Sequence, residues 1–306
     1  MYPTIFLKQD RIDSARYRHP WIFSGAILKK DREVQHGGLV RVQGEDATFL
    51  GVGTYSASSS IAVRVFDVQD VAIDVDWFVR RLTEARGRRH LLGLGEGTDT
   101  TGYRACFGEA DGIPGLVVDL YADVCVFQLS TAGLDQLREQ IIEAINQVFA
   151  QRSIVERSDV AVRKDDGLEE VVAVRTGENP GVVEFLERGR RYLVDVIQGQ
   201  KTGFFLDQRD ARDSVQKLAA GKECLNLFSY TGAFGVAAML GGAKRCHNID
   251  LSERALEGCE RHRVLHGFDA KRFTTEEADI FQWLGERREP SYDLVVLDPP
   301  ALIKSS

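Results

Sequence analysis

Polar and acidic residues occur at the ends of three short apolar runs in the last third of the sequence. The runs lead into Asn226-Leu227-Phe228-Ser229-Tyr230-Thr231-Gly232, Asp250-Leu251 and Asp298-Pro299-Pro300. Gly232 lets a backbone approach a ligand closely. Asp250, 18 residues later in the chain, can accept hydrogen bonds from both hydroxyls of a ribose. The spacing predicts a site for a nucleotide-like cofactor where these runs end.

Two further features indicate what this site binds. Asp279 can reach an adenine amino group while Ile280 packs on the ring face, although the feature taken alone favours Asp279 as the N-cap of the next helix. The prolines of Asp298-Pro299-Pro300 end a run and hold the chain extended, so Asp298 and nearby carbonyls can grip a planar base and its exocyclic amine. A simple turn is the alternative. The pairing of Gly232 with Asp250 fits NAD as well as S-adenosylmethionine, but no G-x-G-x-x-G is present, which disfavours NAD.

The elements that must position these residues alternate between strand and helix from about residue 197. Apolar runs such as Leu294–Leu297 are typical of parallel strands that are covered on both faces. The alternation predicts an α/β, Rossmann-like domain. We expect strands at 225–227, 245–249, 272–275 and 294–297, and helices at 233–240, 252–266 and 280–288, with Ser252 as an N-cap.

Two smaller parts precede this domain. We expect residues 1–72 to form a β-rich module, residues 73–190 to form a helical linker with a central α+β domain, and residues 191–306 to form the α/β domain. Strands of the first part are predicted at 39–42, 48–52 and 61–65. The middle part is predicted to have helices at 77–92 and 134–149 and strands at 115–121, 124–129, 154–156, 170–174, 182–187 and 191–196.

Composition excludes several classes of protein. The 306 residues are 43% hydrophobic and 28% charged, which excludes wholesale disorder. The five cysteines are scattered and never form C-x-x-C, so we expect neither a disulfide framework nor a zinc site, and we expect a cytoplasmic location. Residues 224–243 carry no charge, but their four glycines predict a strand, loop and helix rather than a membrane span. His262 and His266 have no third ligand nearby, so we interpret them as surface residues rather than a metal site.

Basic residues are concentrated in two segments although the net charge is −7. Residues 1–32 hold seven Lys and Arg against three Asp, and residues 77–90 hold five Arg against one Glu. Such clusters can bind phosphates whatever the total charge is, although solvated faces of ordinary elements are the alternative. The candidate nucleic-acid-binding residues in these segments are Arg16, Arg18, His19, Trp21, Lys29, Lys30, Arg88 and Arg89.

The order of several motifs resembles the class I S-adenosylmethionine-dependent methyltransferases of large-subunit ribosomal RNA, with the cytosine-5 enzymes the nearest in kind. The motifs are GQKTGFFLDQRDAR (199–212), LNLFSYTGAFGVAA (225–238), NIDLSERAL (248–256) and VVLDPPALIK (295–304). RHPWIFSGAI (18–27) resembles the start of a PUA RNA-binding module, and FGEADGIPGLVVDLY (107–121) resembles the central domain of these enzymes. The resemblance covers nearly the whole chain. It implies ribosomal RNA as the partner and S-adenosylmethionine as the cofactor.

The resemblance also implies roles for individual residues. Asp298-Pro299-Pro300 would line the target base as the catalytic motif, and no metal is implied. The residues expected to bind the cofactor are Asn226, Phe228, Ser229, Tyr230, Thr231, Gly232, Asp250, Leu251, Asp279 and Ile280. The residues expected to close the site as a hairpin lid are Phe204, Asp207, Gln208 and Arg209.

The sequence departs from this family pattern in two places. Ala301 stands where adenine-N6 enzymes have an aromatic residue, which argues against N6-adenine chemistry. The family's sheet has seven strands, whereas four are predicted here. The family's candidate cysteine nucleophile lies in the segment that follows the Asp-Pro-Pro motif. We therefore expect a C-terminally truncated chain of weak or no activity, with 294–297 as an exposed edge strand.

Two alternatives to a methyltransferase remain at this point. One is a non-catalytic RNA-binding protein that keeps a vestigial methyltransferase fold. The other is a nicotinamide-dependent oxidoreductase, which the missing glycine motif and the presence of Asp298-Pro299-Pro300 disfavour. The oligomeric state is open, a homodimer included.

Overall fold

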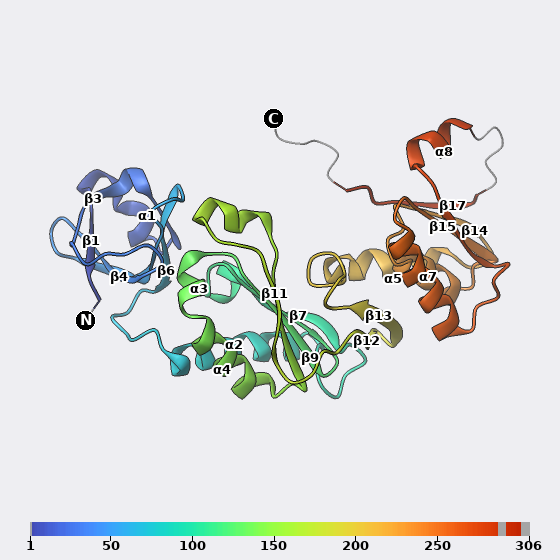
Figure 1. The fold of residues 1–306 in the computed structure, drawn as a ribbon, viewed down its shortest axis with the longest axis horizontal. Helices are drawn as coiled ribbons and strands as arrows, with labels where there is room; N and C mark the ends of the chain where they lie inside the picture. The colour runs from blue at the N-terminus through green and yellow to red at the C-terminus, as the bar shows by residue number, and fades with distance from the viewer. Residues whose placement is uncertain (1, 287–291, 301–306) are drawn as a thin grey trace. The chain divides into compact units, whose positions relative to one another are not determined.

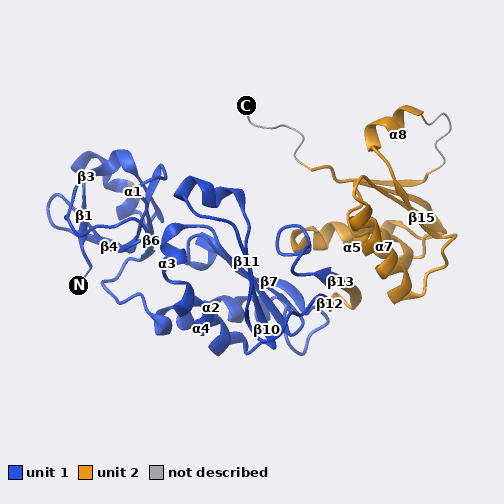
Figure 2. Cartoon of the chain, viewed as in Figure 1, with its two compact units in different colours: residues 1–183, 194–204 blue, residues 184–193, 205–306 orange. Residues whose placement is uncertain are grey.

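The computed structural model describes residues 2–286 and 292–300. The chain divides into two compact units, residues 1–183 with 194–204 and residues 184–193 with 205–306 (Figure 2). The chain passes between them through a two-stranded hairpin, β12 (Val182–Glu187) and β13 (Arg190–Asp195). Both strands of this hairpin were predicted within one residue of their limits.

The first part of unit 1 is a six-stranded sheet with its own apolar core. Its order is β2-β6-β5-β4-β1-β3, and only the β1–β4 pair is parallel. Alternate residues such as Ile5, Leu7, Val40 and Val42 are fully buried in that core. The elements are β1 (Thr4–Leu7), η1 (Gln9–Arg11), α1 (Asp13–Arg16), β2 (Trp21–Phe23), η2 (Ser24–Ala26), β3 (Ile27–Lys30), β4 (Leu39–Gly44), β5 (Phe49–Tyr55) and β6 (Ile61–Asp67).

A second sheet in unit 1 packs against two helices (Figure 1). Its order is β11-β10-β9-β8-β7, and its core contains Phe78, Phe127 and Ile141. The elements are α2 (Val75–Leu91), β7 (Gly102–Phe107), η3 (Gly108–Asp111), β8 (Leu116–Tyr121), β9 (Val124–Leu129), α3 (Ala132–Gln136), α4 (Arg138–Phe149), β10 (Ser153–Ser158), η4 (Ala161–Asp166) and β11 (Val171–Thr176). The helix predicted over 134–149 is therefore two helices.

Unit 2 is built on a four-stranded parallel sheet in the order β16-β15-β14-β17. Its elements are η5 (Leu206–Gln208), α5 (Arg209–Leu218), β14 (Glu223–Leu227), α6 (Ala233–Leu240), β15 (Arg245–Asp250), α7 (Glu253–His266), β16 (Phe273–Glu277), α8 (Ile280–Glu286) and β17 (Leu294–Leu297). The predicted alternation is confirmed, although α5 was missed and residues 287–288 of the predicted last helix lie outside the described residues.

Helices cover both faces of this sheet, as the apolar strands predicted. Leu225 and Leu227 pack with Ile280 and Trp283 of α8 on one face. On the other face α6 approaches so closely that a Cβ on Gly235 would lie 2.3 Å from Asn248 Oδ1. The edge strand β17 keeps Val295 51% and Leu297 61% exposed, as expected for that edge.

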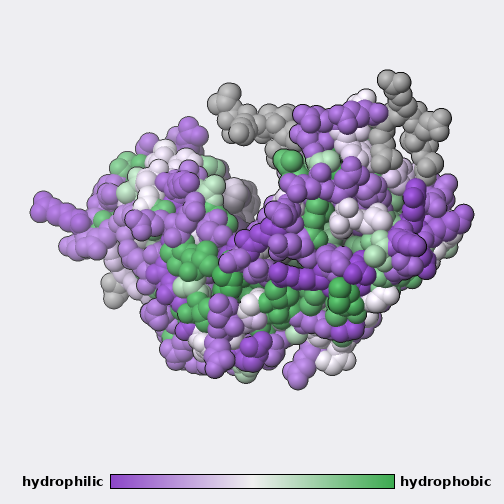
Figure 3. All heavy atoms as spheres, turned by 45° about the vertical axis from the view of Figure 1, so that its right-hand side comes forward, coloured by the Kyte–Doolittle hydropathy of each residue, from purple (hydrophilic) through white to green (hydrophobic). Residues whose placement is uncertain are grey.

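The uncharged stretch 224–243 forms strand β14, a loop and helix α6, which confirms the sequence interpretation. Among the described residues, no helix has the length and apolar character that crossing a membrane requires. The face of the molecule in Figure 3 is mostly polar, with hydrophobic side chains gathered in separate groups.

Candidate active site

The loop between β14 and α6 has an unusual backbone that its neighbours must hold in place. Phe228, Tyr230 and Gly232 all have positive φ angles, of 54°, 49° and 77°. For the two aromatic residues this conformation costs on the order of 1 kcal/mol or more each. Three left-handed residues within five positions turn the chain sharply between strand and helix. Such strain persists only where surrounding contacts compensate for it.

Hydrogen bonds from the next strand supply part of that compensation. The Ser229 amide donates to the Ile249 carbonyl at 2.9 Å, and the Tyr230 amide donates to Asp250 Oδ2 at 2.7 Å. Asp250 Oδ1 also accepts from the Ser252 amide at 3.0 Å. Asp250 therefore lies at the end of β15, where the sequence predicted it, and fixes the loop before any ligand is considered.

His262 of helix α7 supplies the rest of the compensation for the loop's strained backbone. Its Nε2 accepts from the Leu193 amide at 2.8 Å, and its Nδ1 lies 2.8 Å from the Thr231 carbonyl oxygen. An amide can only donate, so Nε2 is unprotonated and the proton on Nδ1 is donated to Thr231. Burial lowers the pKa of His262 to about 4, which keeps the ring neutral. The surface position predicted for His262 was wrong, because the ring is fully buried and links β13 to the loop.

The cysteines of this region have structural roles. All five cysteines of the chain are buried and free. Burial raises the pKa of the Cys224 thiol to about 11 and of the Cys259 thiol to about 12. Cys259 instead donates its S–H to the Tyr230 carbonyl at 3.2 Å and packs under Gly232, where a Cβ would lie 2.7 Å from the sulfur. None of them is an activated thiolate.

The carboxyl ends of the strands leave hydrogen-bonding capacity for a ligand. Thr231 Oγ1 is buried with no partner among the described residues. Asp250 uses one position on each carboxylate oxygen, and a carboxylate can accept about four hydrogen bonds. Asp279 Oδ1 accepts from the Phe281 and Gln282 amides, so Asp279 is the N-cap of α8 and its other oxygen remains. Two carboxylates at one sheet edge fit a ligand with ribose hydroxyls and an amine.

Three predicted cofactor residues are placed differently from the rest. Asn226 is 1% exposed, and its side chain donates to Asn248 Oδ1 at 2.9 Å inside the sheet. Ile280 is 4% exposed and packs in the core with Leu225, so it offers little surface to an adenine ring. Leu251 is 66% exposed beside Asp250. The structure thus favours structural roles for Asn226 and Ile280.

Three of the four residues predicted as a lid lie at the entry to helix α5 in unit 2, with Asp207 and Gln208 in η5 and Arg209 as the first residue of α5. The Phe205 ring meets the Tyr230 ring edge-on, with centroids 5.5 Å apart. Arg212 Nη1 donates to the Phe205 carbonyl at 3.0 Å, and Arg212 Nε donates to the fully buried Glu187 at 2.8 Å. Burial among Arg188 and Arg212 lowers the pKa of Arg209, the lid residue nearest to Glu187 at 3.9 Å. Phe204 is buried but belongs to unit 1.

The Asp298-Pro299-Pro300 motif follows β17 on the same edge of the sheet as the loop. All three residues are exposed. Gln208 Nε2 donates to Asp298 Oδ2 at 3.2 Å, which joins the lid segment to this motif. Asp207, which precedes Gln208 in η5, is also exposed. Ala301, whose identity argued against N6-adenine chemistry, lies outside the described residues.

The candidate RNA-binding residues lie in unit 1, in two settings. Lys29 lies over the Phe6 ring at 4.7 Å, and Lys30 donates to the Tyr55 hydroxyl at 3.0 Å. Arg16 lies 3.7 Å from Asp46, Arg18 is exposed with a φ of 62°, and His19 accepts from the Trp21 amide at 3.1 Å. The Trp21 indole donates to Glu109 Oε1 at 2.7 Å.

Arg88 and Arg89 differ from that group because both bind one buried carboxylate. Arg88 Nη2 lies 2.8 Å from Asp111 Oδ1, and Arg89 Nη2 lies 2.6 Å from Asp111 Oδ2. These contacts hold the pKa of Asp111 below its usual value against the opposing effect of burial. Arg89 therefore has a structural partner, while Arg88 is still 47% exposed.

Two aromatic residues that sequence reasoning missed lie in the same N-terminal segment. Tyr17 is 86% exposed and Phe23 is 52% exposed. Exposed aromatic rings among basic residues are typical of surfaces on which unpaired bases stack. The signal was present in the sequence, since Tyr17 lies between Arg16 and Arg18.

Comparisons with known proteins place this site in a family. Residues 117–306 match the family described as S-adenosylmethionine-dependent methyltransferase, and residues 5–67 match the PUA-like domain. The chain belongs to this family of S-adenosylmethionine-dependent methyltransferases. The predicted fold, cofactor and enzyme class are confirmed, and the nicotinamide-dependent alternative is set aside.

Individual relatives share nearly the full sequence. Ribosomal RNA large subunit methyltransferase I of Aeromonas salmonicida is 43% identical over 98% of this chain and 76% of the relative. The enzyme of the same name from Vibrio cholerae is 41% identical over 100% of this chain and 78% of the relative. The crystal structure of SMU.776, assigned as a methyltransferase and complexed with SAH, superposes with a TM-score of 0.84 at 25% identity. It covers 98% of this chain and 77% of that chain.

Proposed function

We propose that this enzyme methylates C5 of a cytosine in large-subunit ribosomal RNA. The observation that carries the proposal is the 43% identity over 98% of the chain to an enzyme named for large-subunit ribosomal RNA. The site supports it, because the loop 228–232 and Asp298 end neighbouring strands β14 and β17 of one sheet. A base held by Asp298-Pro299-Pro300 would therefore lie beside a cofactor held at the loop.

We assign the cofactor to the loop and the two carboxylates. Asp250 would accept the ribose hydroxyls, and Asp279 would accept the adenine amine. When bound, S-adenosylmethionine supplies an electrophilic methyl group on its sulfonium. The protein's own contribution is to fix the distance and direction of approach, and such positioning accounts for much of the rate in a transfer of this kind.

C5 chemistry also needs a thiolate that attacks C6 of the base. Burial raises the pKa of each of the five cysteines, so none of them would supply that thiolate. The proposal assigns the attack to the nucleophilic cysteine that the family resemblance places after the Asp-Pro-Pro motif. Asp298 and the proline carbonyls would then act on the base itself, gripping its exocyclic amine. Binding by this exposed rim orients the ring and leaves C5 facing the cofactor side.

The modification state of ribosomal RNA tests the proposal. The gene that encodes this chain would be deleted in its source organism, and the nucleosides of large-subunit ribosomal RNA would be measured by mass spectrometry. We expect one 5-methylcytidine to be lost, and to return with the intact gene but not with Asp298→Ala. Unchanged 5-methylcytidine, or loss of a different methylated nucleoside, would overturn the proposal.

A further inference from the structure

The two basic segments of the sequence meet at the short helix η3 of unit 1. The Trp21 indole, from the N-terminal basic segment, donates to Glu109 Oε1 at 2.7 Å. Arg88, from the basic segment of helix α2, donates to Asp111 Oδ1 at 2.8 Å. Glu109 and Asp111 both belong to η3. This one turn therefore brings together two basic segments that lie far apart in the sequence.

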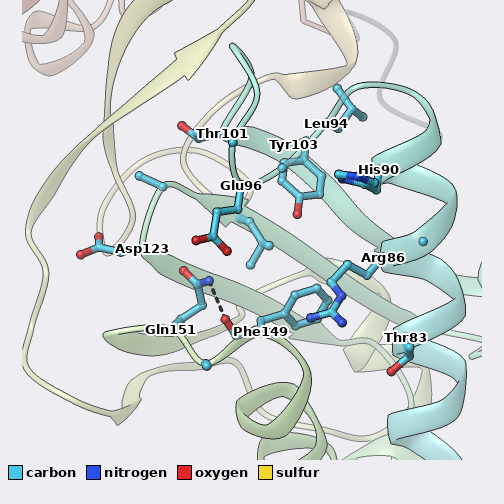
Figure 4. A pocket seen from close by; sticks show the side chains of 16 residues that line it. Thr83, Arg86, His90, Leu94, Glu96, Thr101, Tyr103, Asp123, Phe149 and Gln151 are labelled. Atoms are coloured by element: carbon cyan, nitrogen blue, oxygen red, sulfur yellow. Dashed lines mark hydrogen bonds between the residues drawn. The ribbon is translucent and has the colours of Figure 1, made fainter.

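Helix α2 contributes only part of its arginines to this place. Arg86 instead lines a cavity of about 1080 Å³ beside β7 (Figure 4), and it donates to the Val148 carbonyl. Arg81 donates to a carboxylate of β6 at 2.9 Å. The arginines of α2 that bind η3 are Arg88, whose side chain is 47% exposed, and Arg89, whose side chain is 15% exposed. Arg88 is therefore the one of these two that a ligand can reach readily.

Phe107 comes directly before η3 and holds an exposed ring in a defined position. It is 53% exposed, and its amide donates to Asp111 Oδ2 at 2.7 Å. The guanidinium of Arg104 lies over the ring, 5.2 Å from its centroid. Arg104 is itself fixed by two hydrogen bonds to Asp119, at 2.8 and 2.9 Å. One face of the ring is thus covered by a fixed cation, and the other face is open to a ligand.

The charges around this ring favour an anionic partner. The carboxylates that balance the arginines are buried, since the side chains of Asp111 and Asp119 are 2% and 0% exposed. The side chains of Arg88 and Arg104 remain 47% and 33% exposed. Glu109 is an exposed carboxylate of η3, and it already accepts a hydrogen bond from an indole. Solvent therefore meets guanidinium groups here, with their counter-charges underneath.

The N-terminal side adds rings and positive charge. The His19 ring meets the Trp21 ring edge-on, with centroids 5.7 Å apart. Residues 1–32 carry seven Lys and Arg against three Asp. Exposed aromatic rings beside arginines are the features with which proteins hold single-stranded nucleic acid, because bases stack on the rings and guanidinium groups contact phosphates. A duplex keeps its bases stacked on one another, so it cannot use such a ring.

The η3 surface consists of Trp21, Arg88, Arg104 and Phe107. We propose that this surface binds an unpaired segment of RNA, with one base stacked on the open face of Phe107 and a phosphate held by Arg88. The proposal rests on the proposed function, which makes RNA the substrate. It adds to that function a place at which unit 1 holds the RNA.

The test measures binding of the whole chain to fluorescein-labelled RNAs by fluorescence anisotropy. The probes are an oligouridylate of about ten nucleotides, an abasic ribose-phosphate chain of the same length, and a duplex of the same length. The abasic probe keeps the phosphates without the bases, so it isolates stacking. The variants are Phe107→Leu, Phe107→Tyr and Arg88→Ala. Arg80→Ala is the matched control, because Arg80 is exposed on the same helix about 12 Å away.

We expect the oligouridylate to bind more tightly than the other two probes. Phe107→Leu should weaken its binding about tenfold, the loss of one stacked base, and leave the abasic probe unaffected. Phe107→Tyr keeps the ring and should bind as the unaltered chain does. Arg88→Ala should reduce the slope of log affinity against log salt by about 0.7, the effect of one phosphate contact, while Arg80→Ala should not. Asp111 keeps its hydrogen bonds from Arg89 in that variant, so the fold should be retained.

The proposal is overturned if the oligouridylate does not bind, or if Phe107→Leu, folded by circular dichroism, binds it as tightly as the unaltered chain. Equal losses for the oligouridylate and the abasic probe, equally tight binding of the duplex, or equal effects of Arg88→Ala and Arg80→Ala would also overturn it. Binding requires no methyl transfer, so its failure is separate from that of the proposed function. Phe107-dependent binding with unchanged 5-methylcytidine in the gene deletion would keep this surface and remove the assigned reaction. The reverse result would keep the reaction and remove the surface.

Discussion

The two sides of the proposed methyl-transfer site are held in place to very different degrees. On the cofactor side, Ser229, Tyr230 and Thr231 are fixed by contacts to Ile249, Asp250 and His262. On the base side, Asp298-Pro299-Pro300 is exposed, and Gln208 contacts Asp298 at 3.2 Å. The cofactor side is organised before ligand binds. The base side is made rigid by its prolines, but few contacts fix its position.

This difference matches the two kinds of ligand that we propose for the site. A small ligand that is the same in every turnover suits a preformed loop, whose strain is compensated within the protein. A nucleotide within a large RNA suits a rim that solvent can reach. Perturbing the cofactor side should therefore cost stability and cofactor affinity together, while perturbing the base side should leave both nearly unchanged.

Glu187→Ala should have the largest effect. It leaves Arg212, which is 1% exposed, without its buried carboxylate and also removes one of the partners of Arg190, which keeps Asp213. Loss of one member of a buried ion pair costs about 3–5 kcal/mol. Urea unfolding would measure this loss of stability. Glu184→Ala on the same hairpin breaks a pair with Arg191 that is about half exposed and should cost less than about 1 kcal/mol. Equal losses in the two variants would contradict the buried network.

The pH dependence of stability should reveal that His262 is buried in its neutral form. Its folded pKa of about 4 lies below the ordinary value of 6.5. Between these two pH values the unfolded chain therefore binds a proton on His262 and the folded chain does not. The folded state is therefore fully favoured above pH 6.5 and loses roughly 3 kcal/mol as the pH falls to 4. His262→Asn should lower stability at neutral pH and flatten that slope. Unfolding free energies between pH 4.5 and pH 7.5 would show it, and an unchanged slope would disprove the neutral buried ring.

Asp250→Ala should weaken binding of S-adenosylhomocysteine roughly 30-fold, since charged hydrogen bonds contribute about 1.5–3 kcal/mol. The carboxylate accepts from Tyr230 and Ser252 already, so the loop would also lose order. Asp250→Asn keeps an acceptor oxygen and should lose less. Affinities from calorimetry would rank the variants, and full affinity in Asp250→Ala would remove this residue from the site.

Gln208→Ala should have the smallest effect. Its 3.2 Å contact with Asp298 is exposed, so we expect unfolding free energy to change by less than about 0.5 kcal/mol and cofactor affinity to stay the same. RNA methylation should fall several-fold if the contact positions the base rim. A large loss of stability would show that the base side is as tightly organised as the cofactor side.

Much of the fold was accessible from the sequence because its signals are local. The limits of β9, β12, α6 and β17 were predicted to the residue. Helix α5 was missed because Arg212 is buried there beside Glu187, and an apolar pattern does not reveal a charged residue at a core position. The short strands β1, β2 and β3 were missed because their pairing depends on partners elsewhere in the chain.

The site was accessible in part for the same reason. Asp250 and the loop 228–232 were placed at the sheet edge from strand ends and one glycine, which are local features. The roles of His262, Asn226 and Arg89 depend on partners 22 to 69 residues away, such as Leu193, Asn248 and Asp111. Spacing alone does not specify those pairs, so His262 was expected at the surface and Arg89 in a free basic patch.

Calorimetric titration with S-adenosylhomocysteine, with NADH as the control, tests the central claim most directly. A preformed loop with Asp250 at the end of β15 should bind S-adenosylhomocysteine with micromolar affinity and should not bind NADH. Equal affinity for NADH, or no binding of S-adenosylhomocysteine by a chain that is folded by circular dichroism, would contradict it.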